Sequence, residues 1–192
     1  MRVITGTAKG FRLYAPKGTE TRPALDQVKE AVFNILMNVE QFDVLDLFAG
    51  TGSMGIEALS RGAKRCTFVE KSKVPVEYIY RNVKHCHLDD RAQIMMLPVD
   101  AAIRKMAKMN QKFDLIFVDP PYLKRLVNAT LFQLEKAELL ADDGLIVVEH
   151  HPKEPIDEIP GFTLTDQRAY GQTLISFLGQ AVEKNQLLQQ PR

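Results

Sequence analysis

The chain has 192 residues, of which 45% are hydrophobic and 26% are charged, so its length and composition suit one α/β domain with a sizeable core. A formal net charge of +1 gives no polycationic signal for nucleic acid, and two cysteines are too few for a disulfide scaffold. No segment resembles a signal peptide or approaches the roughly 20 apolar residues of a membrane span, so we expect a reduced, cytoplasmic protein without a membrane segment.

In chain order, the first predicted element is a short β-hairpin over residues 3–13 with a glycine-rich turn. A helix then begins at Pro23 and keeps apolar residues on one face as far as Val39. From there strands and helices alternate. Strands are predicted at 44–48, 66–70, 94–97, 113–118 and 145–148, and helices at 53–61, 74–86, 101–109 and 126–140. The last two predicted strands, 162–170 and 173–178, have no helix between them.

This alternation predicts an α/β fold, with a mainly parallel, seven-stranded, doubly wound sheet covered by helices on both faces. The final hairpin would place one antiparallel strand in that sheet. We expect a single domain over residues 1–180, with residues 1–40 as an N-terminal docking subregion and residues 181–192 as a flexible tail. Such sheets bind ligands at the carboxyl ends of their strands, so the residues after each strand are the candidates for chemistry.

A glycine-rich loop follows the first strand of the predicted sheet. Gly50, Gly52 and Gly55 match the G-x-G-x-x-G pattern, which by itself fits NAD, FAD or S-adenosylmethionine. Asp46 favours S-adenosylmethionine, because a carboxylate would repel a pyrophosphate but suit the ammonium group of a methionine moiety. Glu70 ends the next strand, where an acid would bind the ribose hydroxyls. The alternative for Asp46 is a helix-capping or turn acid.

Asp100 follows the third predicted strand and could accept a hydrogen bond from an adenine amino group. An N-cap role for the next helix is an equal alternative. S-adenosylmethionine is therefore the predicted cofactor. The candidate residues for its binding are Asp46, Phe48, Ala49, Gly50, Thr51, Gly52, Gly55, Glu70, Asp100 and Ala101.

The predicted catalytic motif is Asp119-Pro120-Pro121-Tyr122, directly after the fourth strand of the sheet. Two prolines fix a rigid turn, so Asp119 and the Pro120 carbonyl could together accept two hydrogen bonds from one amino group. An amino group on an aromatic base is a poor nucleophile, and two acceptors would direct its lone pair at a sulfonium methyl. Tyr122 offers a face for stacking the base. The alternative is a tight turn with an N-cap aspartate.

The first 17 residues carry basic but no acidic side chains, which is typical either of a phosphate-docking edge or of a solvated extension. Arg22 could approach the catalytic motif or an RNA phosphate, or form a surface salt bridge. The candidate RNA-binding residues are Arg2, Lys9, Arg12, Lys17 and Arg22.

Two histidine-containing segments are weaker candidates. His85-Cys86-His87 has no second ligand pair at zinc spacing, so we expect no metal site. Glu149-His150-His151 follows the fifth strand and could face the rim of the site, but we favour a solvated loop there.

Several segments together carry a family resemblance: 2–6, 10–13, 21–23, 30–36, 46–55, 57–62, 119–122 and 170–173. They resemble the bacterial small-subunit ribosomal RNA guanine-N(2) methyltransferase family of the RsmD type, over about residues 1–178. The resemblance implies a Rossmann-like class I methyltransferase fold and methylation of the 2-amino group of one guanine in 16S rRNA. It also implies a substrate that is a small ribosomal subunit or its assembly intermediate, and we expect a monomer. Gln27 stands where the family often has a basic residue, which weakens any RNA contact at that position.

Two other functions stay open at this point. An adenine amino-methyltransferase acting on DNA or RNA would use the same Asp-Pro-Pro-Tyr chemistry. A non-catalytic RNA-binding protein could keep the fold, although the intact glycine loop, acid and motif argue against it. A dehydrogenase is the weakest alternative, because it usually needs a second domain for its substrate.

Overall fold

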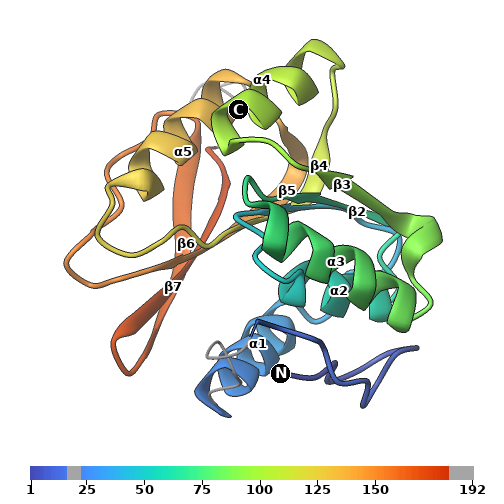
Figure 1. Ribbon diagram of the computed structural model, residues 1–192. Helices are drawn as coiled ribbons and strands as arrows, with labels where there is room; N and C mark the ends of the chain where they lie inside the picture. The colour runs from blue at the N-terminus through green and yellow to red at the C-terminus, as the bar shows by residue number, and fades with distance from the viewer. Residues whose placement is uncertain (17–22, 182–192) are drawn as a thin grey trace, which may run out of the picture.

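The computed structural model describes residues 1–16 and 23–181, and Figure 1 shows a central sheet with helices on both faces. The helices are α1 (Pro23–Leu36), α2 (Ser53–Ser60), α3 (Lys73–His85), α4 (Val99–Lys108) and α5 (Leu126–Lys136), with a 3-10 turn at Asp89–Arg91. The strands are β1 (Asp43–Leu47), β2 (Arg65–Val69), β3 (Ala92–Met95), β4 (Phe113–Val118), β5 (Leu140–His150), β6 (Phe162–Tyr170) and β7 (Thr173–Gln180).

The seven strands form one sheet in the order β3-β2-β1-β4-β5-β7-β6. Neighbours from β3 through β5 are parallel, and β7 runs antiparallel to both β5 and β6. The predicted mainly parallel sheet with one antiparallel strand is confirmed. The strand order reverses between β1 and β4, where Leu47 pairs with Val118. The glycine loop and the Asp-Pro-Pro-Tyr motif therefore leave the sheet side by side at its switch point.

The two faces of the sheet bury separate apolar layers because side chains alternate along each strand. On β1, Val44 joins the layer that contains Val32 of α1 and Ile79 of α3. Leu45 faces the other way, into the layer that contains Leu131 of α5. Figure 1 shows α1, α2 and α3 on one side and α4 and α5 on the other.

The predicted N-terminal hairpin forms with irregular pairing: the Val3 amide donates to the Phe11 carbonyl at 3.0 Å, and one antiparallel bridge joins Arg2 and Arg12. Backbone donors at its turn bond to helix α2: the amide of Thr7 donates to the Ser60 carbonyl at 2.8 Å, and that of Ala8 to the Ser60 hydroxyl at 2.9 Å. Gly6 has a φ of +88°, and a Cβ there would lie 1.8 Å from the Ser60 carbonyl oxygen. The short ladder between the two arms is thus supplemented by packing of the turn onto α2.

Several predicted boundaries differ by a few residues. Helix α1 ends at Leu36 rather than near 39, because Met37 takes a left-handed φ of 57°. Helix α5 ends at Lys136, before Glu138, whose φ of 48° is also left-handed. Strand β5 begins at Leu140 rather than at the predicted residue 145, and its pairing with β4 is irregular between Leu140 and Leu145. Within the described residues, no helix is long and apolar enough to cross a membrane. The predicted tail from 182 onwards lies outside them.

Candidate active site

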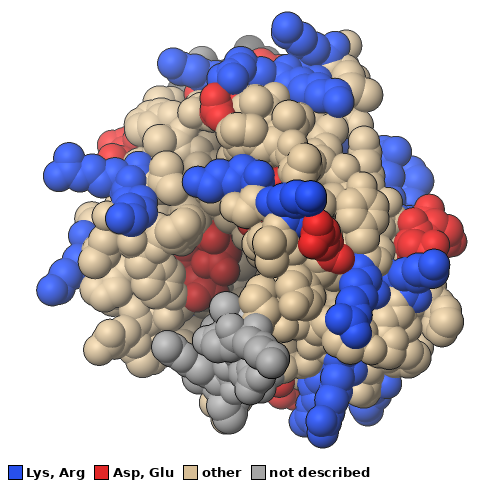
Figure 2. Space-filling model, in the orientation of Figure 1, with Lys and Arg blue, Asp and Glu red and all other residues tan. Residues whose placement is uncertain are grey.

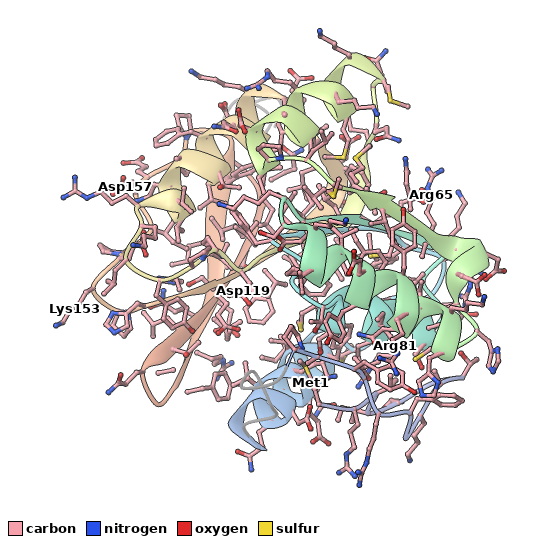
Figure 3. All side chains as sticks on the ribbon, in the orientation of Figure 1. Met1, Arg65, Arg81, Asp119, Lys153 and Asp157 are labelled. Atoms are coloured by element: carbon pink, nitrogen blue, oxygen red, sulfur yellow. The ribbon has the colours of Figure 1, made fainter. Side chains whose placement is uncertain are left out.

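Two adjoining cavities open at the carboxyl ends of the parallel strands. The larger has a volume of about 740 Å³ and lies between the ends of β2 and β4 and the start of α4. The smaller, of about 210 Å³, lies between the glycine loop, α1 and the ends of β5 and β7. Phe48, Asp119 and Glu149 line both cavities. Figure 2 shows acidic side chains inside this hollow, and Figure 3 labels Asp119 there in the same orientation.

Glycine is required at the three positions of the loop for different structural reasons. Gly50 and Gly52 take left-handed φ values of 54° and 85°, which turn the chain from β1 into α2. Gly55 lies within α2, where a Cβ would come within 2.3 Å of the Phe68 ring and 2.5 Å of the Cys66 sulfur. Gly55 therefore allows close packing of helix on sheet, while Gly50 and Gly52 shape the loop.

Asp46 is a buried carboxylate at the wall of the smaller cavity, with 3% of its surface exposed. Its Oδ2 accepts a hydrogen bond from the Gly55 amide at 2.9 Å. Burial, with a smaller contribution from the charge of Glu70, raises the pKa of Asp46 to about 7, although the Gly55 hydrogen bond acts in the opposite direction. A carboxylate held in this way would gain from a cationic ligand in the cavity beside it.

Glu70 connects two loops at the edge of the larger cavity. Its Oε2 accepts from the Gly50 amide at 3.2 Å and its Oε1 from the Ser72 amide at 2.8 Å. Asp100 also lines this cavity, from the first turn of α4, and pairs with Arg104 at 2.9 Å. Pro98 rather than Asp100 is the N-cap, so the capping alternative for Asp100 is wrong.

The structure brings most of the predicted cofactor residues to the hollow. Those that line a cavity are Asp46, Phe48, Ala49, Gly50, Thr51, Glu70 and Asp100. Those that line neither cavity are Gly52, Gly55 and Ala101.

The Asp119–Tyr122 turn forms the wall between β4 and α5. Asp119 is exposed to the hollow rather than buried in the core, and enclosure by the cavity walls, with the charges of Glu149 and Asp46, raises the pKa of its carboxyl. The Tyr122 hydroxyl donates to Glu149 Oε1 at 2.6 Å and lies 2.8 Å from the Thr173 hydroxyl. These two contacts fix the orientation of a ring that is 37% exposed at the cavity.

The interpretation of residues 149–151 as a solvated loop is wrong. Strand β5 extends through His150, and its register pairs Glu149 with Ile175 and His150 with Leu174 of β7. His150 is buried, with Nδ1 2.9 Å from the Glu154 carbonyl and Nε2 2.8 Å from the Ser176 hydroxyl. Two polar residues after an apolar run predict that the strand ends before them. Pairing with β7 extends the strand through both residues.

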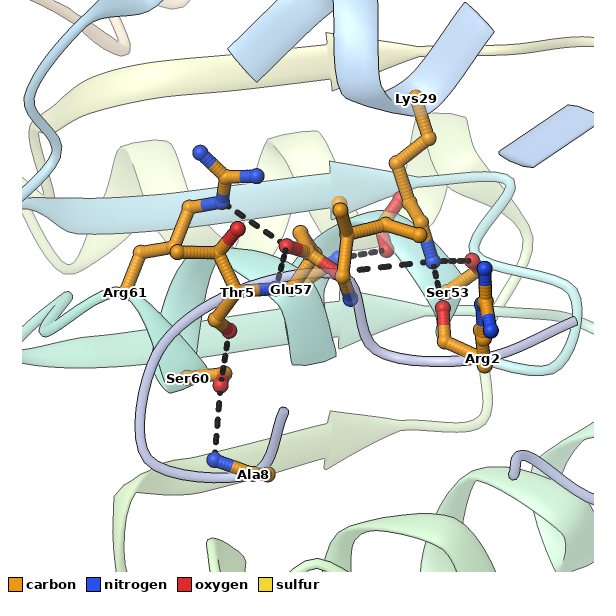
Figure 4. Close-up of polar contacts among 11 residues, drawn as sticks. Arg2, Thr5, Ala8, Lys29, Ser53, Glu57, Ser60 and Arg61 are labelled. Carbon is orange, nitrogen blue, oxygen red and sulfur yellow. Dashed lines mark hydrogen bonds and ion pairs between the residues drawn. The ribbon is translucent and has the colours of Figure 1, made fainter. Parts of the chain in front are cut away.

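A buried charge cluster that sequence reasoning did not single out joins the N-terminal segment to the glycine loop (Figure 4). Glu57 of α2 accepts from the amides of Ile4 and Thr5 at 2.8 and 3.0 Å, and from Arg61 Nε at 2.8 Å. Lys29 Nζ lies 3.6 Å from Glu57 and donates to the Arg2 carbonyl at 2.6 Å. Burial lowers the pKa of Lys29. Glu57 has no exposed surface, and the available signal in the sequence was a charged residue between Ile56 and Ala58 in the helix after the glycine loop.

The predicted RNA-binding side chains of Arg2, Lys9 and Arg12 are exposed, whereas Lys17 and Arg22 lie outside the described residues. In the part of the chain that the structure describes, no group of three or more His, Cys, Asp and Glu residues could hold a metal ion. The His85 ring packs against Phe11 at 5.1 Å between centroids.

The sheet order and the residues at its switch point define a class: the Rossmann-like, class I methyltransferase type of α/β protein. The model of one family, described as "Conserved hypothetical protein 95", matches residues 1–179. The chain therefore belongs to this family.

Named relatives agree with this class. YlbH of Bacillus subtilis, whose name places it provisionally among rRNA methyltransferases, is 40% identical over 90% of this chain and 95% of its own. The ribosomal RNA small subunit methyltransferase D of Haemophilus influenzae is 33% identical over 89% of each chain. The predicted RsmD-type family is thereby confirmed.

Solved structures share the fold. The yhhF protein of Escherichia coli, provisionally described as a methyltransferase, has a TM-score of 0.81 at 27% identity and covers 95% of this chain and 99% of its own. A more distant protein, SMU.776, also provisionally described as a methyltransferase, was solved in complex with SAH. It has a TM-score of 0.65 at 17% identity and covers 82% of this chain and 50% of its own. At that identity the likeness extends to the fold alone.

Proposed function

We propose that this protein transfers a methyl group from S-adenosylmethionine to the exocyclic 2-amino group of a specific guanine in 16S rRNA. The observation that carries the proposal is the adjacency of the Asp119–Tyr122 turn and the Asp46 loop at one switch point. The relative named ribosomal RNA small subunit methyltransferase D supports the substrate class.

The residues around the two cavities fit S-adenosylmethionine. Asp46 would receive the methionine ammonium, Glu70 the ribose hydroxyls and Asp100 the adenine amino group. The buried Asp46 carboxylate supports this fit, because its raised pKa would fall on pairing with a cation. When bound, the cofactor supplies an activated methyl group on a sulfonium, so the protein needs no metal and no covalent intermediate.

The motif residues would hold and orient the target amino group. Asp119 and the Pro120 carbonyl accept one hydrogen bond each from the amino group, which favours a more tetrahedral nitrogen. Tyr122 stacks on the base after the nucleotide has turned out of its own stack. Orientation of this kind can lower a barrier by about 7–11 kcal/mol. The proton released from the amino group passes to Asp119 or to water.

The N-terminal subregion, residues 1–40, would dock on rRNA phosphates. The exposed side chains of Arg2, Lys9 and Arg12 support this role, and Glu57 holds the nearby backbone amides of Ile4 and Thr5. We also infer a single catalytic domain over residues 1–180, a monomer, a cytoplasmic location, and a substrate that is the small subunit or its assembly intermediate.

The test is transfer of labelled methyl from S-adenosylmethionine to unmodified small subunits, naked 16S rRNA or duplex DNA, with the product nucleoside identified after digestion. We expect 2-methylguanosine from one of the two ribosomal substrates. Asp119→Ala should abolish transfer and leave cofactor binding largely intact, and equal turnover in that variant would refute the assignment. Label in methyladenine would instead favour the adenine enzyme. Cofactor binding without label anywhere would favour a non-catalytic protein.

A further inference from the structure

Glu149 occupies a place in the hollow that the proposed chemistry does not yet use. Val118 of β4 and Val148 of β5 pair in parallel register, so Asp119 and Glu149 follow them on neighbouring strands at the same edge of the sheet. Both residues line both cavities. The structure thus places a second carboxylate beside the one proposed to hold the target amino group.

The Glu149 side chain is held in place. The Tyr122 hydroxyl donates to its Oε1 at 2.6 Å, and the Thr173 hydroxyl supports the tyrosine at 2.8 Å. An ionised carboxylate can accept about four hydrogen bonds in all, so this one contact leaves capacity for a ligand. The ring expected to stack on the base and the acid beside it are therefore oriented by each other.

Guanine and adenine present different edges to such a site. The Watson–Crick edge of guanine has three donor hydrogens next to one another, two on N2 and one on N1. Adenine has two on N6, but its N1 is an acceptor. Asp119, the Pro120 carbonyl and Glu149 supply three acceptors, which match guanine and would set a carboxylate against the lone pair of adenine N1.

We propose that Glu149 accepts the N1–H of the target guanine and is thereby a specificity-determining residue for guanine over adenine. This inference rests on the proposed function, because it takes the Asp119–Tyr122 turn as the holder of the amino group. It adds a base-reading role to a strand end that lies outside the motif.

The test uses the small subunit as substrate, after the labelled guanine has been mapped. A synthetic RNA segment then introduces 2-aminopurine at that position, which keeps the 2-amino group but has an acceptor at N1. We expect wild-type protein to lose about 10- to 100-fold in kcat/KM on this substrate. Glu149→Gln, whose amide can donate to N1, should lose a similar factor on guanine and recover activity on 2-aminopurine.

Matched variants separate recognition from damage to the fold. Glu158→Gln removes an exposed carboxylate outside both cavities and should leave both rates unchanged. Glu149→Gln should keep wild-type cofactor binding and be at least as stable as the wild-type protein, because it removes a partly desolvated carboxylate. If that variant does not fold, Glu149→Ala provides the comparison, because it removes the acceptor and should narrow the difference in rate between guanine and 2-aminopurine.

The two proposals fail in different ways. Absence of 2-methylguanosine with wild-type protein would overturn the proposed function. Normal guanine methylation by a protein that accepts 2-aminopurine equally well would overturn only the role of Glu149. A Glu149→Gln variant that keeps the wild-type preference for guanine over 2-aminopurine would also overturn the role of Glu149.

Discussion

Asp46→Asn should make the free protein more stable and the cofactor complex weaker. The carboxylate is buried, and its Oδ2 accepts from the Gly55 amide at 2.9 Å. An asparagine carbonyl can accept the same hydrogen bond without placing a charge in the interior. The exchange therefore keeps the contact that shapes the loop and removes the desolvated charge.

The size of the gain follows from the pKa. Burial raises the pKa of Asp46 from 3.8 to about 7, and one pKa unit corresponds to about 1.36 kcal/mol, so ionised Asp46 costs the folded state about 4 kcal/mol. The NH₂ group of the new asparagine would be buried without a hydrogen-bond acceptor, which destabilises the folded state by about 1–3 kcal/mol and offsets part of the gain. We expect a net gain of about 1–3 kcal/mol at about pH 8, where melting temperature should rise by about 2–4 °C per kcal/mol.

The sign of the effect depends on pH. Because the pKa is raised on folding, the stability given by the protonated acid is complete below 3.8 and is lost as pH rises through about 7. The advantage of Asp46→Asn should therefore shrink by more than half between about pH 8 and about pH 5.

Thermal melting at both pH values and calorimetric titration of ligands provide the measurement. S-adenosylmethionine should bind Asp46→Asn at least about 30-fold more weakly, since a buried charge pair is lost. 5′-Methylthioadenosine, which lacks the amino acid part, should bind both proteins equally. A stability gain that does not depend on pH, or unchanged cofactor affinity, would refute the reasoning.

Three further predictions test other parts of the site. Gly55→Ala should destabilise the protein by about 1–3 kcal/mol in urea unfolding, because the new Cβ meets an aromatic carbon of β2 at 2.3 Å. Glu57→Gln should cost about 3 kcal/mol by the same assay, since it leaves a buried lysine without its partner, whereas Glu77→Gln in an exposed pair should cost less than about 1 kcal/mol. The kcat/KM for methyl transfer should fall on acidification, and the fall should begin above the ordinary carboxyl pKa values of 3.8 and 4.5, because the pKa values of Asp119 and Glu149 are raised and protonation removes these acceptors. A flat profile would contradict this role.

Much of the architecture could be predicted from the sequence. Periods of two and of about 3.6 residues are local properties, so the alternation of strands and helices and the final hairpin were visible without coordinates. The glycine loop and the Asp119–Tyr122 motif were equally visible, because each is a contiguous segment whose residue types fix its own backbone. Their adjacency followed from the general rule for parallel sheets.

The tertiary structure alone decided which residues far apart in sequence meet. The polar Glu-His pair at the end of β5 predicts a loop, whereas pairing with β7 prolongs the strand and places Glu149 beside Asp119. The pattern of the N-terminal segment predicts a hairpin but not its attachment to α2, where the carboxylate of Glu57 and the hydroxyl of Ser60 accept from amides near the turn. The hydrogen-bond partners and the desolvation of a group depend on all the residues that pack around it. Most of these residues are distant in sequence, so the local sequence pattern does not identify them.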